Sequence, residues 1–221
     1  MRSTVVKKVI MSVTGLIMIG FLLVHMYGNL KMFSGPEAYD GYAHWLKEDI
    51  LYPLVPHGTF IWLFRFVLLA AVVAHIWSAT SLSVRTIGVR GPGYDMFKPQ
   101  AQTYSERTMR WGGILIAGFI VFHLLQFTVR VIRTGFSTSA GPYEMFVDSF
   151  SLWWVFALYA VLIFLICMHI RHGFWSAFQT LGLNSSLKSR RWLNVLGIGV
   201  AVVLYIGFML PPLAVLIGWI K

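Results

Sequence analysis

Charged residues are scarce in this 221-residue chain, where they make up 12% of the sequence against 57% hydrophobic residues. A soluble domain carries about 25% charged residues, so a soluble fold would leave more apolar surface than one small core can bury. Cysteine is almost absent as well, because only Cys167 is present and it lies within an apolar run. One thiol cannot form an internal disulfide or hold an iron–sulfur cluster, which needs several thiolates. The composition therefore predicts a membrane protein that carries no iron–sulfur cluster of its own.

Acidic side chains are missing from the interior of the long apolar runs. All eight acids fall in the predicted loops or at the ends of the runs: Glu37, Asp40, Glu48, Asp49, Asp95, Glu106, Glu144 and Asp148. Intramembrane proton relays commonly include carboxylates. We therefore expect no buried carboxylate to relay protons through this chain.

Five apolar runs are long enough to cross a bilayer, which takes about 20 residues of helix. They cover about residues 9–30, 60–84, 109–133, 149–176 and 192–220. The sequence therefore predicts an all-α integral membrane protein, a five-transmembrane-helix bundle that forms a single membrane domain over residues 1–221. A short surface helix is expected between the first two spans, starting at Pro36.

The net charge of +10 is explained by membrane topology rather than by nucleic acid, because the basic residues lie between the apolar runs. Lys and Arg concentrate in cytoplasmic loops. An N-terminus inside the cell places twelve of them on the inner side: Arg2, Lys7, Lys8, Arg85, Arg90, Lys98, Arg107, Arg110, Arg171, Lys188, Arg190 and Arg191. The outer side then holds five: Lys31, Lys47, Arg130, Arg133 and Lys221. We therefore expect a cytoplasmic N-terminus and a C-terminus outside.

Each of the first four apolar runs contains a histidine, namely His25, His75, His123 and His169. At a rise of about 1.5 Å per residue, His25 and His123 lie toward the outer face, and His75 and His169 toward the inner face. A haem iron can take one imidazole on each side, so these depths predict an outer b haem between His25 and His123 and an inner b haem between His75 and His169. His172 shares a helix face with His169, and spacing alone leaves either of them as the inner ligand. The remaining histidines, His44 and His57, are expected to be surface or interfacial polar residues.

Several stretches resemble the five-helix, di-haem cytochrome b anchor subunit of succinate:menaquinone oxidoreductases and of the related fumarate reductases. The resemblance covers nearly the whole chain. It is carried by KVIMSVTG (8–15), LVHMYGN (23–29), FSGPEAY (33–39), AH (74–75), VFH (121–123) with Arg130, and HIRHGFWS (169–176) with Gly182. In that family the ligand is the histidine that precedes the Gly-x-Trp-Ser element by four residues, which favours His169 over His172, and the helices pair first with third and second with fourth.

The resemblance implies a multi-pass protein of the cell inner (cytoplasmic) membrane, part of respiratory complex II of the tricarboxylic acid cycle. A flavoprotein subunit would exchange succinate and fumarate, and an iron–sulfur subunit would pass electrons to two haem b groups in this chain. Menaquinone would be the membrane substrate. The chain would thus be the non-flavin membrane subunit of succinate dehydrogenase, with no catalytic residue for succinate.

Further residues receive expected roles in such a complex. At the inner side, haem propionates or the docking subunit would meet His172, Arg171, Arg85, Arg110 and Lys188, and Arg130 and Arg65 would act at the outer haem. Ser12 is a candidate hydrogen-bond donor to a quinone at the inner side. The alternative for the cations is that they are plain topology-setting charges.

Two other functions compete with this interpretation. A di-haem cytochrome b subunit of another quinone-linked dehydrogenase or of a hydrogenase also uses intramembrane histidines. A non-haem membrane transporter could use histidines as proton relays, although such relays commonly include the intramembrane acids that this sequence lacks.

Overall fold

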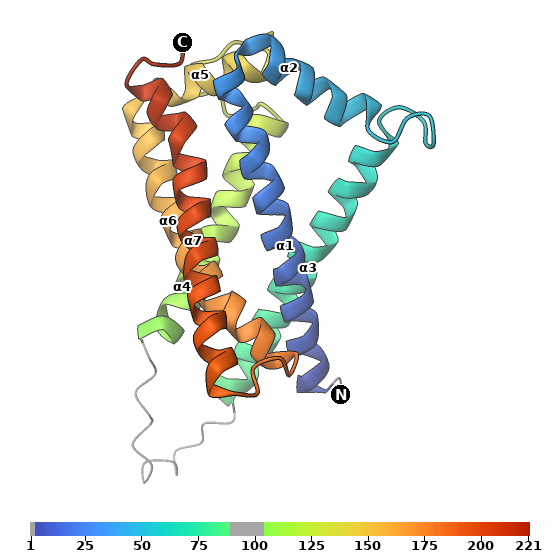
Figure 1. The fold of residues 1–221 in the computed structure, drawn as a ribbon, viewed down its shortest axis with the longest axis vertical. Helices are drawn as coiled ribbons and strands as arrows, with labels where there is room; N and C mark the ends of the chain where they lie inside the picture. The colour runs from blue at the N-terminus through green and yellow to red at the C-terminus, as the bar shows by residue number, and fades with distance from the viewer. Residues whose placement is uncertain (1–2, 89–103) are drawn as a thin grey trace.

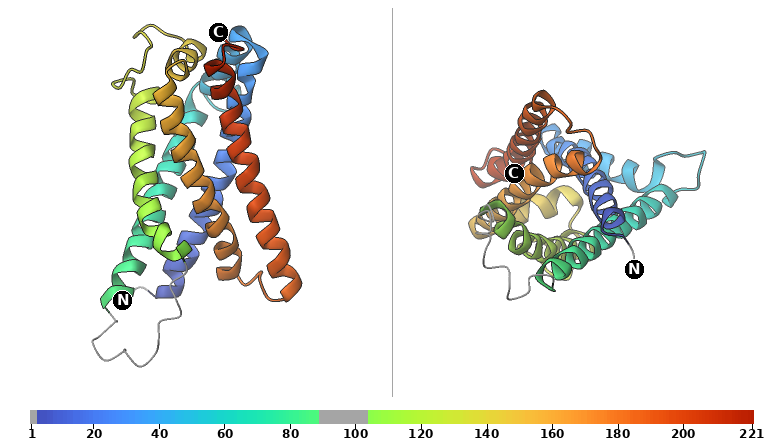
Figure 2. Two further views of the ribbon diagram at one scale, coloured as in Figure 1. Left: turned by 90° about the vertical axis from the view of Figure 1, so that its left-hand side faces the viewer. Right: turned by 90° about the horizontal axis from the view of Figure 1, so that it is seen from below.

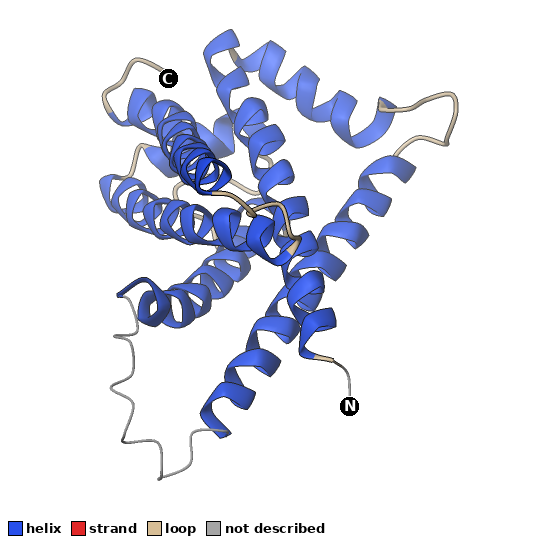
Figure 3. Cartoon of the chain, turned by 60° about the horizontal axis from the view of Figure 1, so that its bottom comes forward, coloured by secondary structure: helices blue, strands red, loops and turns tan. Residues whose placement is uncertain are grey.

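The computed structural model describes residues 3–88 and 104–221, and the predicted loop residues Arg2, Arg90, Asp95 and Lys98 lie outside them, as do the side chains of Glu106 and Arg107. The described chain consists of helices joined by turns and loops, with no strand in it (Figure 3). Five helices are long and apolar enough to cross a membrane: Thr4–Ser34, Thr59–Arg85, Met109–Thr128, Trp153–Thr180 and Leu187–Leu216. The predicted all-α, five-span architecture is confirmed.

The spanning helices run alternately up and down the bundle (Figure 1). They are α1 (Thr4–Leu30), α3 (Thr59–Gly88), α4 (Tyr104–His123) with its continuation η3 (Leu124–Thr128), α6 (Trp153–Thr180) and α7 (Leu187–Leu216). The two termini lie at opposite ends of the bundle (Figure 1), as an odd number of spans requires. We call these ends the N-terminal end and the C-terminal end.

Short helices cover the C-terminal end of the bundle. They are η1 (Lys31–Ser34), α2 (Pro36–His44), η2 (Trp45–Asp49) and α5 (Pro142–Phe150). Helix α2 starts at Pro36, as the sequence predicted, because proline lacks the N–H that a first helical residue leaves unused. It leads away from the bundle toward the start of α3 (Figure 1). The backbone N–H of Tyr143 in α5 donates to Asp40 in α2 over 2.9 Å, which ties these two surface helices together.

The observed span boundaries differ from the predicted ones in every span but the second, and the first span covers Thr4–Ser34 rather than 9–30. The third span ends at Thr128 rather than at 133, and Arg130 just beyond it has a φ of 64°, which no helix continues through. The fourth span starts at Trp153 rather than at 149, because residues up to Phe150 belong to the surface helix α5. The fifth covers 187–216 rather than 192–220, since Ser186 caps it by accepting a hydrogen bond from a backbone N–H in its first turn. Polar and apolar composition alone does not locate such caps and breaks.

Packing is uneven across the bundle. Helix α6 packs along α7, and α1 packs along α3, with α1 also touching both α6 and α7 (Figure 2). The main core lies around α5, α6 and α7, where Phe150, Val155, Tyr159 and Leu204 are almost completely buried. All five spanning helices also expose large apolar side chains, as expected of surfaces whose surroundings are hydrocarbon. Helix α3 is therefore held mainly by α1 and α4 by α6, while α1 links α3 to the α6–α7 pair.

Candidate functional site

The four intramembrane histidines lie in two pairs within the bundle. The ring centroids of His25 (α1) and His123 (α4) are 6.0 Å apart, with an angle of 77° between the ring planes. The ring centroids of His75 (α3) and His169 (α6) are 6.3 Å apart, with an angle of 61°. All four side chains are half-buried. The structure thus brings together the same residues that the depth argument paired.

These separations match the spacing of two imidazoles on one metal ion. A metal–imidazole nitrogen bond is about 2 Å long, and a ring with bonds of about 1.33 Å places its nitrogens about 1.1 Å from its centre. Two ligands on opposite sides of one ion therefore have centroids about 6 Å apart. The rings can turn about their common axis, so both interplanar angles are compatible with such a pair.

The ring of His75 is oriented by helix α1. Its Nδ1 lies 3.0 Å from the Met11 carbonyl oxygen and 3.2 Å from the Thr14 hydroxyl oxygen. A carbonyl oxygen only accepts, and the Thr14 hydroxyl donates to Ile10 O over 2.7 Å, so the proton must be on Nδ1 of His75. The neutral ring then presents the lone pair of Nε2, as a metal-binding histidine does when its other nitrogen donates elsewhere. A Cβ on Gly15 would lie 3.4 Å from the same ring, so this glycine lets α1 approach closely.

The ring of His123 is oriented by a buried chain of polar side chains. Its Nδ1 lies 3.1 Å from the Tyr159 hydroxyl, which donates to the Gln126 side-chain oxygen over 2.6 Å. The Tyr159 oxygen therefore accepts from Nδ1–H of His123, and Nε2 is again left with its lone pair. The Gln126 amide donates to Thr134 over 2.6 Å, and Thr134 donates to Ser149 over 2.9 Å. Each donor from His123 through Tyr159 and Gln126 to Thr134 thus has an acceptor along this network, which ends at the Ser149 oxygen.

The sequence did not reveal this hydrogen-bonded network, because its four side chains from Gln126 to Tyr159 are uncharged and spread over 34 positions. Gln126 is fully buried, and it lies on the π-helix η3, where Val129 N–H reaches back five residues to Leu124 O over 2.8 Å. Single π-turns occur often at functional sites. A buried glutamine one turn after an intramembrane histidine was the one available signal in the sequence.

The ring of His169 differs from those of His75 and His123, because its Nδ1 has no hydrogen-bond partner among the described residues. Nδ1 of His169 is buried without a partner, and so is Oγ of Ser78, which lies one helical turn from His75 on α3. Buried polar atoms are nearly always hydrogen-bonded, and the other exceptions among the described residues are the two side-chain atoms of Asn184. The unpaired atoms of His169 and Ser78 leave two positions where a bound group can form hydrogen bonds. Aromatic rings pack against the His25–His123 pair. Phe21 stacks on His25, and the ring centroids of Phe119 and His123 are 5.8 Å apart. This combination of imidazoles and apolar rings fits a flat, largely apolar macrocycle with a central metal.

The predicted inner cations lie near the N-terminal end of the bundle. Arg110, Arg171 and Lys188 are exposed, and Arg85 is half-buried. His172 is half-buried one turn beyond His169 on α6, toward the N-terminal end. The ring that lies against His75 is that of His169.

The two predicted outer cations have partners within the chain. Arg65 lies over the ring of Trp62, with 4.9 Å between the guanidinium carbon and the ring centroid. Arg130 donates to Ala140 O over 3.3 Å. These contacts are compatible with plain structural roles, so their haem-related roles remain predictions.

Ser12, the predicted quinone donor, is buried on α1, and its hydroxyl donates to Lys8 O over 2.9 Å. A cavity of about 430 Å³ opens nearby between α1 and α6. Its lining consists of Val5, Lys8, Met11, Ser176, Gln179 and Thr180. Met11 also holds His75 through its carbonyl, so this cavity adjoins the His75–His169 pair.

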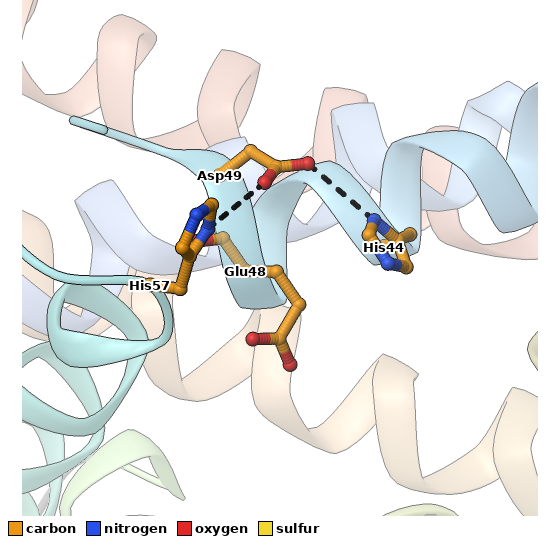
Figure 4. Close-up of polar contacts among 4 residues, drawn as sticks. All are labelled: His44, Glu48, Asp49 and His57. Atoms are coloured by element: carbon orange, nitrogen blue, oxygen red, sulfur yellow. Dashed lines mark hydrogen bonds and ion pairs between the residues drawn. The ribbon is translucent and has the colours of Figure 1, made fainter. Parts of the chain in front are cut away.

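The two remaining histidines are surface residues, as expected: His44 ends α2, and His57 lies in the connection between η2 and α3. Nδ1 of His44 is 3.4 Å from one carboxylate oxygen of Asp49, and Nδ1 of His57 is 3.2 Å from the other (Figure 4). Both rings are more than half exposed, and Glu48 points away from Asp49 (Figure 4). Within the described ranges no group of three or more His, Cys, Asp or Glu side chains is arranged to hold a metal ion.

Comparison with known proteins adds no assignment: no family model matches the chain, and neither a curated protein nor a solved structure gives a significant match. The site must therefore be interpreted from its own geometry.

Proposed function

We propose that this chain is the cytochrome b membrane anchor of a succinate:quinone oxidoreductase. In this proposal two haem b groups are held by His25 with His123 and by His75 with His169, and electrons pass through them between an iron–sulfur subunit and menaquinone. The chain would reside in the cell inner membrane with its N-terminal end toward the cytoplasm, where the flavoprotein and iron–sulfur subunits bind. The observation that carries the proposal is the 6.0 and 6.3 Å separation of the two ring pairs.

The haem groups supply the one-electron chemistry when bound, and the chain supplies ligands, orientation and an apolar surrounding. Met11 and Tyr159 hold Nδ1–H of His75 and His123, which leaves Nε2 of each ring for the metal. Both pairs lie in helices that span the membrane, one pair toward each end of the bundle. Two centres stacked in this way divide the distance across the membrane into shorter electron-transfer steps.

Haem content tests the proposal directly. A pyridine haemochrome assay on the purified chain should give two b haems per polypeptide. Substituting His25, His75, His123 or His169 by alanine, one at a time, should remove one haem in each case. Matched substitutions of the exposed His44 and His57 should leave both haems. A haem-free chain purified from cells with ample haem would refute the proposal and favour relay histidines in a transporter.

The ring pairs themselves do not identify the partner proteins, so the same geometry also supports a cytochrome b of another quinone-linked dehydrogenase or of a hydrogenase. Purification from native membranes distinguishes the two. A succinate-reducible b spectrum with co-purifying flavoprotein and iron–sulfur subunits supports the proposed complex. A b spectrum reduced by formate or hydrogen, but not by succinate, supports the alternative.

A further inference from the structure

Lys7 is a buried cation near the N-terminal end of the bundle. Its side chain is 7% exposed, its ammonium group donates to the Ser81 hydroxyl on α3, and it lies 5.3 Å from the ring centroid of Trp77. Both ion pairs found in the described residues belong to Asp49, at the other end of the bundle. No described carboxylate therefore neutralises Lys7, although an uncompensated buried charge is strongly destabilising.

The position of Lys7 relates it to the His75–His169 pair. Lys7, Met11 and Thr14 are spaced i, i+4 and i+7, so they share one face of α1. The second and third of these residues contact His75, and Lys7 contacts Ser81. Ser81 lies six residues beyond His75 on α3, which is about 9 Å along the helix. The ammonium group therefore lies on the same side of α1 as the His75 contacts, displaced toward the N-terminal end.

Two hydroxyl groups accompany the ammonium group. Ser78 lies between His75 and Ser81 along α3, is completely buried, and its Oγ has no partner. The Ser81 oxygen accepts from Lys7, which leaves its own O–H available as a donor. An ammonium and two hydroxyl donors at one place form a site that matches the acceptor oxygens of a carboxylate.

We propose that Lys7, together with Ser78 and Ser81, binds a carboxylate of the ligand held by His75 and His169. This identification rests on the proposed function: the carboxylate is a haem propionate that extends toward the N-terminal end. Burial distinguishes Lys7 from the Arg and Lys residues that the sequence favoured for this role, since Arg110, Arg171 and Lys188 are exposed and Arg85 is only half-buried. An exposed pair contributes little, whereas a buried charge-assisted pair contributes more.

The test compares haem with haem dimethyl ester, whose propionates are neutral. The full-length chain carries His25→Ala so that only the His75–His169 pair binds, and each compound is titrated into the haem-depleted protein with the Soret band as readout. Lys7→Met keeps the apolar stem and removes the charge. It should weaken haem binding by at least about ten-fold, as expected for loss of one partner of a buried charge pair, and should leave ester binding nearly unchanged. Lys8→Met, which removes the adjacent exposed cation, should change neither.

The outcomes separate this assignment from the proposed function. Equal weakening of haem and ester by Lys7→Met, or no weakening of either, would overturn the carboxylate site while leaving the haem ligands in place. A chain that binds no haem would overturn the proposed function and this site with it. If Lys7→Met does not fold, Ser78→Ala is used with the same two compounds. It should weaken the binding of haem several-fold relative to that of the ester, and an unchanged ratio would count against the site.

Discussion

Replacing Tyr159 with phenylalanine removes one hydroxyl from the middle of the buried polar chain and keeps the ring. The ring packs against Phe119 and Phe150, with centroids 5.1 and 4.9 Å apart, and these contacts survive the substitution. Two hydrogen bonds are lost, one from His123 and one to Gln126. In a soluble core each unpaired buried group would cost about 1–3 kcal/mol.

The magnitude is smaller in a membrane. Hydrogen bonds between transmembrane helices average about 0.6 kcal/mol and reach about 1.7 kcal/mol, because the unfolded chain in the membrane finds other partners. Both lost bonds involve fully or largely buried atoms, so we expect Tyr159→Phe to lower the free energy of unfolding by about 1–3 kcal/mol. Reversible unfolding in mixed detergent micelles measures it. Tyr205→Phe, on a half-buried ring packed against Phe164, is the matched control.

A loss of unfolding free energy below about 0.5 kcal/mol lies within the range of ordinary surface substitutions. Such a result would refute the reasoning that the polar side chains around Tyr159 form a stabilising hydrogen-bond network. In the haem-loaded protein, Tyr159→Phe should also change the low-spin ferric electron paramagnetic resonance signal of one haem only, because His123 loses the acceptor that fixes its ring. Equal changes in both haem signals would show that the substitution disturbs the bundle as a whole.

Two further substitutions test the C-terminal end of the bundle. Gly135 and Gly35 both have a φ of 90°, but a Cβ on Gly135 would lie 2.9 Å from the Asp148 carbonyl oxygen, whereas Gly35 has open space. Gly135→Ala should therefore lower the detergent-unfolding free energy by about 1–3 kcal/mol more than Gly35→Ala, and equal losses would contradict the overlap. Burial, followed by the nearby Asp40 charge, raises the pKa of Tyr39 to about 12. The unfolded chain therefore loses the Tyr39 hydroxyl proton at a lower pH than the folded chain does. The free energy of unfolding should fall as the pH rises from about 10, the usual tyrosine pKa, toward the folded-state pKa. Tyr39→Phe should remove this part of the loss, and a chain whose alkaline unfolding is unchanged by Tyr39→Phe would contradict it.

The spanning architecture was predictable because one physical signal, the length of uncharged apolar runs, determines it. The ends of the spans were not equally predictable. Ser149 and Phe150 continue the uncharged run of the fourth span, yet they belong to the surface helix that Pro142 starts, and the chain turns at Ser151 and Leu152. Local capping and turn geometry decide such boundaries, and hydropathy is insensitive to both.

The histidine pairing was predictable for a related reason. Depth along a straight helix follows from residue number, so four isolated histidines could be sorted into two levels. Their supporting contacts could not be predicted. Lys7 has the same sequence signature as any topology-setting lysine at the start of a span, and only the contact with Ser81 on α3 shows that its side chain is buried. The position of the Gln126 side chain depends on the π-helical turn η3, and no periodicity in the sequence indicates that turn.

The two ring pairs differ in what holds them, and this difference has a functional consequence. His75 donates to a backbone carbonyl, that of Met11, and the Thr14 hydroxyl only shares the bond. His123 donates to a side chain, Tyr159, whose own orientation depends on Gln126. Backbone support persists through most substitutions, so Thr14→Val should leave the His75 ring in place, whereas Tyr159→Phe frees the His123 ring. Hydrogen bonding to a ligand imidazole raises its basicity and tunes the metal. If the proposed haems bind, a single side chain, Tyr159, would tune the potential of the one at His25 and His123, whereas a backbone carbonyl orients the His75 ligand of the other.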